Sequence, residues 1–399
     1  HNSLHSLLWH DIKSLFLTYS LPWLIIIYSF LVLSKKEMIS CQFLFADCTM
    51  QNPEKNKKTH IQIYQETLEQ IEHADKRGFS TFNTLEHHCF EEFSISANPM
   101  ALFAAAAQRT KNIRFRTCSH VLPLHNPVVF AGQVGVTDIL TGGRFEFAVG
   151  RGHAWVFPKT SIPLEESRER FVEALEMIEK ALEEKEFSYH GKYFNVENVK
   201  VVPRPLTKPR IFTGGASNYN YELAGKKGWG VLITPMLPLA AVAGQLDIYR
   251  KACKKHGHTP DIVYVQALYL DEDGDRARKE AEPYIKQFMK GNVAPMSDLP
   301  PKEELVNKDF GFYASGALEN LTEIPYQKLL DDEYVWVGSP NEIKGKISKI
   351  MEDCPNLSEI AVLCTYAGME HWKTMRTQEL FSKHIISAFK ERAIEELVT

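Results

Sequence analysis

The stretch Arg144–Trp155, which reads RFEFAVGRGHAW, decides the fold assignment of this 399-residue chain. Its first half is an apolar run typical of a buried β-strand, and the run breaks at Gly150-Arg151-Gly152 into a polar loop. Small residues at the rim of a sheet let backbone N–H groups approach a ligand, and arginine offers a planar fork of donors to a phosphate. The stretch therefore predicts an anion site, while a simple turn with a solvated arginine remains the alternative on this segment alone.

Further apolar runs on both sides of this strand alternate with helical patterns, which indicates repeated βα units and a parallel sheet. With Arg144–Val149 they give eight strand candidates, the others being Phe43–Ala46, Phe79–Leu85, Ile113–Cys118, Ile211–Thr213, Trp229–Ile233, Ile262–Leu270 and Ile360–Cys364. Helices are expected at 60–77, from Pro99, from Pro127, and at 165–182, 218–227, 239–256, 273–290, 340–351 and 369–391. The pattern predicts an α/β fold, a TIM (β/α)8 barrel with insertions.

Two segments interrupt the alternation. Phe187–His190 and Tyr193–Val202 flank Gly191-Lys192, a two-residue turn pattern that predicts a hairpin. Residues 291–335 show little regular period, and we expect the main insertion there. No strong linker divides the chain, so residues 38–399 are expected to form a single domain.

The N-terminal region needs a separate interpretation. Leu15–Leu33 is uncharged and about long enough to cross a bilayer. The chain begins with His1, however, and its first methionine is Met38, directly before the first predicted strand. We expect residues 1–37 to be an extension that is not part of the native enzyme, with a membrane anchor as the main alternative and a signal peptide as the third.

The amino-acid composition argues against some classes of binding partner and of structural site. The formal net charge is −4 and no long basic run occurs, which argues against nucleic acid. The seven cysteines are scattered without a C-x-x-C pair, so they suggest neither a disulfide framework nor a zinc site. A reducing compartment, the cytoplasm, fits best.

Ligands of a parallel barrel bind at the C-terminal ends of its strands, and four segments there carry reactive or polar residues. They are Glu86–Phe90, Cys118–Pro127, Gly150–His153 and Gly214–Ser217. The last of these opens a predicted helix, whose free N–H groups and dipole favour an anion beside Arg151. A glycine-rich turn capped by Ser217 or Asn218 is the alternative.

Glu86-His87-His88 has the residue types of a metal site, but adjacent histidines on an extended segment point in opposite directions. We therefore expect no metal. An imidazole that donates or accepts a proton, or anchors a substrate, is favoured over one core and one surface histidine. His120 and His125 allow the same two interpretations.

These segments in this order resemble the bacterial luciferase-like flavin-dependent monooxygenases. The resemblance extends from about Cys41 to Leu232, and more loosely to Ala388. It rests on Glu86-His87-His88-x-Phe90, Val121-Leu122-Pro123-x-x-Asn126-Pro127, Gly143-Arg144-Phe145, Gly150-Arg151-Gly152, Pro203-Arg204-Pro205 and Val337-Gly338-Ser339-Pro340.

The resemblance implies a TIM barrel that binds reduced FMN, on which molecular oxygen gives a flavin hydroperoxide that oxygenates a small organic substrate. It also implies a homodimer built through the early helices. No G-x-G-x-x-G follows a strand, which fits reduced flavin supplied by a separate flavin reductase. The alternatives are a deazaflavin-dependent oxidoreductase of the same fold and a non-catalytic flavin-binding protein.

By position, the resemblance makes Arg151 and Ser217 the residues that hold the FMN phosphate, in loops that also contain Gly150, Gly215 and Ala216. Glu86 would sit beneath the flavin, and His87 would be the acid/base group near flavin and substrate. The Cys118–Ser119 bond falls where the family often has a non-prolyl cis peptide beside the flavin.

Two positions depart from luciferase itself. Gly150 stands where luciferase has a reactive cysteine, and Ala216 stands where it has a glutamate. Both differences favour the broader oxygenase branch over light emission.

Overall fold

The structure, a computed structural model, describes residues 41–47, 50–215, 217–307 and 310–391. Its contacts divide the chain into two units, and the unit Gln42–Ile386 contains all elements discussed below. The predicted extension or anchor at residues 1–37 lies outside the described residues, as does Ala216. Among the helices that are described, none is long and apolar enough to cross a membrane.

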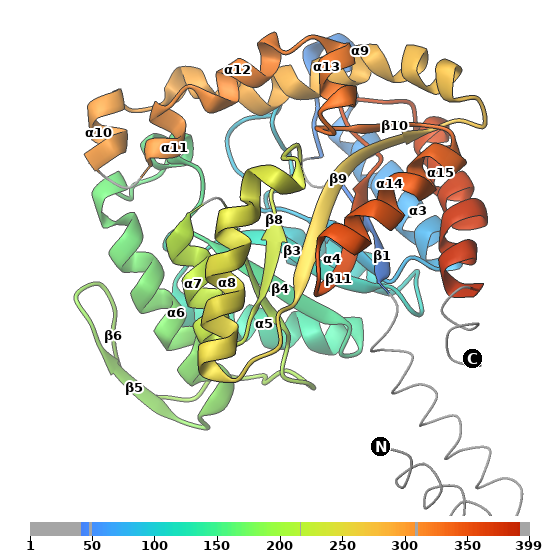
Figure 1. The fold of residues 1–399 in the computed structure, drawn as a ribbon. Coiled ribbons are helices and arrows are strands. Elements are labelled where there is room, and N and C mark those ends of the chain that lie inside the picture. The colour runs from blue at the N-terminus through green and yellow to red at the C-terminus, as the bar shows by residue number, and fades with distance from the viewer. Residues whose placement is uncertain (1–40, 48–49, 216, 308–309, 392–399) are drawn as a thin grey trace, which may run out of the picture. The chain divides into compact units, whose positions relative to one another are not determined.

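Eight parallel strands form the closed barrel that the sequence predicts, and all eight strand candidates are confirmed (Figure 1). The strand order is β9-β11-β1-β2-β3-β4-β7-β8, and pairing of β8 with β9 closes the ring. A ninth, short strand, β10, pairs with β9 and was not predicted. The bounds are β1 Gln42–Ala46, β2 Thr81–Thr84, β3 Arg114–Val121, β4 Phe145–Gly150, β7 Ile211–Gly214, β8 Gly230–Ile233, β9 Ile262–Leu270, β10 Trp336–Gly338 and β11 Leu357–Leu363.

The longer helices follow the strands along the chain, close to their predicted positions. They are α3 His60–Lys76, α4 Pro99–Ala107, α5 Pro127–Thr141, α6 Ser167–Glu183, α7 Asn218–Lys227, α8 Ala243–His256, α9 Gly274–Val293, α14 Pro340–Asp353 and α15 His371–Phe381. Short 3-10 helices are η1 Glu54–Asn56, η2 Leu122–Leu124, η3 Ala154–Lys159, η4 Leu164–Glu166 and η5 Leu239–Val242, and η7 Ser382–Ile386 is a π-turn. The predicted hairpin is β5 Phe187–His190 with β6 Asn195–Val199.

Asparagine caps set the start of the two helices that follow β2 and β3. Asn98 accepts a hydrogen bond from the backbone of Ala101, and Asn126 accepts one from Val128 at 3.0 Å. In both helices a proline fills the first position, where no N–H is needed. These caps fix where the loops after β2 and β3 end.

The predicted insertion contains more regular structure than expected. Five short elements occupy it: η6 Ala294–Asp298, α10 Lys302–Asn307, α11 Gly311–Ala314, α12 Ala317–Glu323 and α13 Tyr326–Asp331. Elements of four to seven residues are too short to show a helical period in the sequence. Figure 1 shows α10 to α13 together with α9 at the end of the barrel toward which β9 runs.

The opposite end of the barrel interior is filled by charges. Arg116 of β3 is fully buried and binds Glu146 of β4 and Glu359 of β11, with 3.0 Å between its Nη2 and Glu359 Oε1. Arg210 contacts both carboxylates at 3.2 Å. Because β3 and β11 are not neighbours, these bonds cross the barrel interior near the N-terminal ends of the strands.

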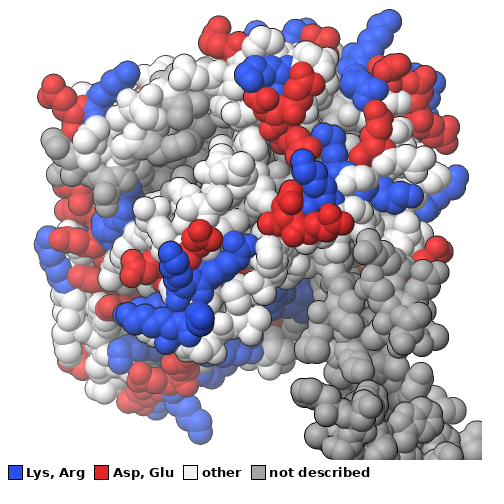
Figure 2. Space-filling model, in the orientation of Figure 1, with Lys and Arg blue, Asp and Glu red and all other residues white. Residues whose placement is uncertain are grey.

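The outer surface carries both signs of charge. Figure 2 shows lysine and arginine side chains next to aspartate and glutamate side chains over the face in view. Many charged side chains of the described residues form ion pairs, such as Lys227 with Glu179 at 2.7 Å. That face therefore offers no single-sign field of the kind that attracts a polyanion.

Candidate active site

The loop after β4 lies directly against the end of β3. A Cβ atom on Gly150 would come within 2.5 Å of the Ser119 hydroxyl, and one on Gly152 within 2.4 Å of Val121 Cγ1. Gly152 also has φ +91°, which side chains rarely tolerate. Close packing thus favours glycine at both positions, and the space of a cysteine side chain at position 150 is taken by Ser119.

The predicted non-prolyl cis peptide between Cys118 and Ser119 is present. It lies within β3, where the register with β4 shifts between Thr117 and His120. Ser119 also joins two predicted site segments, because its carbonyl accepts a 3.2 Å hydrogen bond from the backbone N–H of Glu86. The structure therefore brings Glu86, Ser119 and Gly150 together at the C-terminal end of the barrel.

The predicted anion-binding loop after β7 opens helix α7 as expected. Gly215 has φ +101°, and the Ser217 hydroxyl caps the helix by accepting from the backbone N–H of Asn220. The Asn220 side chain donates to the Gly214 carbonyl at 2.8 Å, which closes the turn. The positive dipole end of α7 thus lies at this loop and favours an anion there.

Arg151 follows β4, the neighbour of β7, so the two predicted halves of the anion site emerge from adjacent strands. The Arg151 guanidinium lies 3.6 Å from the centroid of the Phe310 ring, in a cation–π contact with the insertion. No motif or spacing in the sequence singles out Phe310. This contact connects the phosphate-type loop to the segment that covers the barrel end.

His87 lies in a buried aromatic cluster. Its ring centroid is 4.3 Å from that of Phe93, and its Nε2 accepts a 2.8 Å hydrogen bond from Trp155 Nε1. His153 stacks on Trp155 at 4.4 Å, and its Nδ1 lies 2.8 Å from the Tyr313 hydroxyl. Burial, reinforced by His153 and His88, lowers the pKa of His87 to about 2, and burial lowers that of His153 to about 4. Both imidazoles are therefore neutral at physiological pH.

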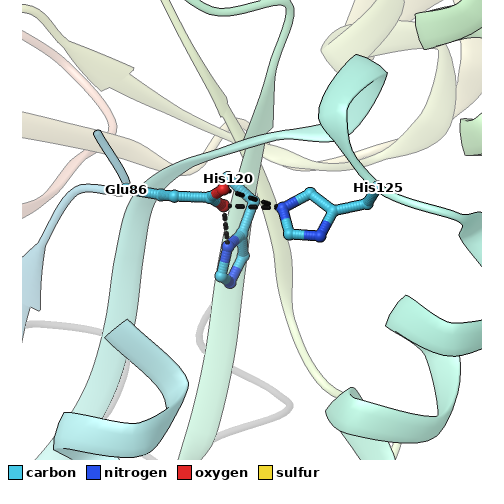
Figure 3. A group of neighbouring side chains, drawn as sticks. All are labelled: Glu86, His120 and His125. Atoms are coloured by element: carbon cyan, nitrogen blue, oxygen red, sulfur yellow. Dashed lines mark hydrogen bonds and ion pairs between the residues drawn. The ribbon is translucent and has the colours of Figure 1, made fainter. Parts of the chain in front are cut away.

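Glu86 lies in a separate cluster in which three imidazoles surround one buried carboxylate. Oε2 of Glu86 is 2.8 Å from His120 Nδ1, and Oε1 is 2.8 Å from both His125 Nε2 and His88 Nε2. Figure 3 shows how Glu86, His120 and His125 converge from different parts of the chain. Although burial alone would raise it, the hydrogen bonds from these histidines hold the pKa of Glu86 well below its usual range.

The donor atoms of Glu86, His120 and His125 all lie within 4.8 Å of one another, a grouping compatible with a metal ion. The 2.8 Å separations are, however, those of N–H···O hydrogen bonds. As predicted, the adjacent His87 and His88 have different partners, Trp155 and Glu86. What the sequence did not reveal is that His120 and His125 approach Glu86.

The chain matches a known protein family and several known proteins, and these matches agree with the geometry of the site. The model of the family described as luciferase-like monooxygenase matches residues 43–354. The oxygenase component of the flavin-dependent trigonelline monooxygenase of Acinetobacter baylyi is 27% identical over 263 residues, which cover 61% of this chain and 73% of that protein.

Two solved structures share the fold. A monooxygenase from Streptomyces bottropensis superimposes with a TM-score of 0.72 at 25% identity, covering 87% of this chain and 99% of that one. The oxygenating constituent of 3,6-diketocamphane monooxygenase from Pseudomonas putida, solved with FMN, gives a TM-score of 0.71 at 20% identity, with 87% and 98% covered.

Proposed function

The chain belongs to the luciferase-like monooxygenase family, and from this premise we propose that it binds reduced FMN and oxygenates a small organic substrate with molecular oxygen. The observation that carries the cofactor assignment is the pairing of β4 with β7. This pairing sets the Gly150-Arg151-Gly152 loop beside the capped start of α7. An arginine loop and a helix N-terminus that follow adjacent strands are both features that bind a phosphate monoester.

Two groups of residues in this chain would bind the cofactor, one at its phosphate and one at its ring system. Arg151, the N–H groups at the start of α7 and Ser217 would hold the phosphate. The backbone of Gly150 and Ser119 would pack against the ring system, because Gly150 carries no side chain. Reduced flavin, when bound, supplies the electrons that activate oxygen. The aromatic side chains around His87 would keep water from the reacting atoms.

We propose that reduced FMN comes from a separate flavin reductase, since no dinucleotide-binding glycine motif follows a strand. The trigonelline enzyme of Acinetobacter baylyi is likewise described as an oxygenase component. The reaction would then need three small molecules at the barrel end, namely reduced FMN, oxygen and the organic substrate.

We also propose that the protein is a homodimer through α4 and α5. Aliphatic side chains on α5 are exposed to an unusual degree, with Val129 at 57% and Leu140 at 48%. They border a shallow hollow of about 540 Å³ that also includes Met100 and Ala104 of α4. A second copy of this surface would bury these side chains and complete their packing.

The cofactor assignment is tested by measuring binding of FMN and riboflavin under reducing conditions. Arg151→Ala should weaken FMN binding about 10- to 100-fold, the worth of a charge-assisted hydrogen-bond pair, and leave riboflavin binding unchanged. Arg109→Ala, at an exposed arginine after α4, is the matched control. Binding of a deazaflavin cofactor in place of FMN, or equal losses for both flavins, would refute the assignment.

A further inference from the structure

The hydrogen bond between Trp155 and His87 fixes where the imidazole proton lies. An indole N–H can only donate, so the nitrogen that receives it, Nε2 of His87, must present its lone pair. A ring flipped by 180° would put a carbon atom against the indole N–H. In a neutral imidazole the single proton therefore sits on Nδ1.

The surroundings of His87 keep the ring neutral. His87 and Trp155 are each 1% exposed, and aromatic rings of Phe90 and Phe93 pack against the imidazole. The titratable groups that face it are His153 and His88, which lower its pKa, and Glu86, which raises it by less. Beyond them lie two further groups, Tyr313, whose hydroxyl contacts His153, and Arg151, whose charge acts on Tyr313.

The Nδ1 atom of His87 is buried and has no hydrogen-bond partner among the described residues. A buried N–H without an acceptor is costly, and native structures keep few of them. An N–H that is fixed in direction and left unpaired at the end of the barrel is suited to an acceptor on a bound molecule.

We propose that His87 acts as a neutral hydrogen-bond donor, through Nδ1–H, to an uncharged oxygen of a bound molecule, and that Trp155 is the positioning residue that fixes this tautomer. The proposal rests on the proposed function in that the bound molecule is the flavin or the organic substrate. It narrows the acid/base role that the family resemblance implies, because Nε2 is occupied by the Trp155 N–H and Nδ1 already carries its proton, so His87 cannot act as a base in this state.

The tautomer can be measured without any cofactor or turnover. In the whole protein labelled with 15N-histidine, long-range 1H–15N spectra distinguish a protonated Nδ1 from a protonated Nε2, and loss of one signal in His87→Asn assigns the residue. We expect His87 to be protonated at Nδ1 alone from pH 5.5 to 8.5. A protonated Nε2, or a doubly protonated ring at neutral pH, would overturn the proposal.

Trp155→Phe tests the positioning role, since it keeps an aromatic ring and removes only the N–H donor. We expect the His87 signals to change to a mixture of tautomers, or to the Nε2–H form, while Phe93→Leu leaves the Nδ1–H form in place. An unchanged tautomer in Trp155→Phe would contradict the role of Trp155 even if the protein binds FMN as proposed.

Titration with FMN then identifies the acceptor. A change in the Nδ1–H signal on binding of FMN places the oxygen on the flavin, whereas an unchanged signal with FMN bound rules out the flavin as the acceptor. If FMN does not bind at all, the proposed function fails while the tautomer result stands, so the two outcomes are distinguishable.

Discussion

Asp47, at the end of β1, illustrates how burial changes the pKa of a side chain. It is 1% exposed, and its Oδ1 accepts a 2.9 Å hydrogen bond from the backbone of Met50. Burial raises the pKa of Asp47 to about 7, more than the bond from Met50 and the charge of Lys58 lower it. Since the folded state holds this proton more tightly than the unfolded state, the contribution of Asp47 to stability falls as the pH rises from about 4 to about 7.

Asp47→Asn should remove that pH dependence. Its Oδ1 can still accept from Met50, so the free energy of unfolding of the variant, relative to the wild type, should increase by about 4 kcal/mol at most between pH 4 and pH 8. Chemical denaturation at a series of pH values measures this difference. Asp247→Asn, at an exposed aspartate, is the control and should show a flat difference. A flat difference for Asp47→Asn as well would contradict a raised pKa.

A second prediction concerns the close approach of Gly150 and Ser119. Gly150→Ala places a Cβ 2.5 Å from the Ser119 hydroxyl, so we expect a loss of about 1–3 kcal/mol in the free energy of unfolding. The double variant Gly150→Ala/Ser119→Gly should recover most of this loss, because it removes the clashing atom. Thermal and urea denaturation of the single and double variants test the coupling, and additive effects would show that the two side chains do not compete for this space.

The residue scale also shows what the sequence could not predict. The argument that adjacent histidines diverge was confirmed for His87 and His88, because it depends only on the local backbone. The convergence of His120 and His125 on Glu86 depends on how two separate loops fold. Nothing in the spacing of these residues reveals a contact across 34 or 39 positions.

At the scale of elements, the barrel strands could be predicted because both of their faces are buried. All six residues of β4 and all nine of β9 are buried, which gives nearly continuous apolar runs, interrupted by Glu146 in β4 and Gln266 in β9. The asparagine–proline pairs before α4 and α5 were equally clear, since each acts within one turn. The elements of the insertion were missed because their shortness leaves no period to detect.

The ion network inside the barrel gives a prediction about these strands. Arg116→Met leaves Glu146 and Glu359 buried without their main partner, so we expect a loss of about 3–5 kcal/mol in the free energy of unfolding. Arg210 still contacts both carboxylates and limits the loss of stability. Adding Glu359→Gln to Arg116→Met should restore part of the stability. Urea denaturation measures the free energy of unfolding of both variants. A lower value in the double variant than in Arg116→Met would contradict this explanation.

At the scale of the whole molecule, the apolar surface of α5 predicts the oligomeric state. Val136→Lys places a charge in the proposed dimer contact and should shift the protein from twice the mass of one chain to a single chain. Light scattering after size-exclusion chromatography measures this mass. Ile61→Lys, at a 70% exposed residue of α3, is the matched control and should remain dimeric. A wild-type protein with the mass of one chain would rule out the dimer.

The barrel and the insertion contribute different structural features to the end of the barrel where they meet. Strand ends supply the glycine loop, the capped helix and His87, whereas the insertion supplies Phe310 over Arg151 and Tyr313 against His153. Mutations in the insertion can therefore change which molecules are accepted while the eight-strand frame and its phosphate-type loops keep their sequence. New substrate ranges can evolve in such an enzyme by changes in a few short helices.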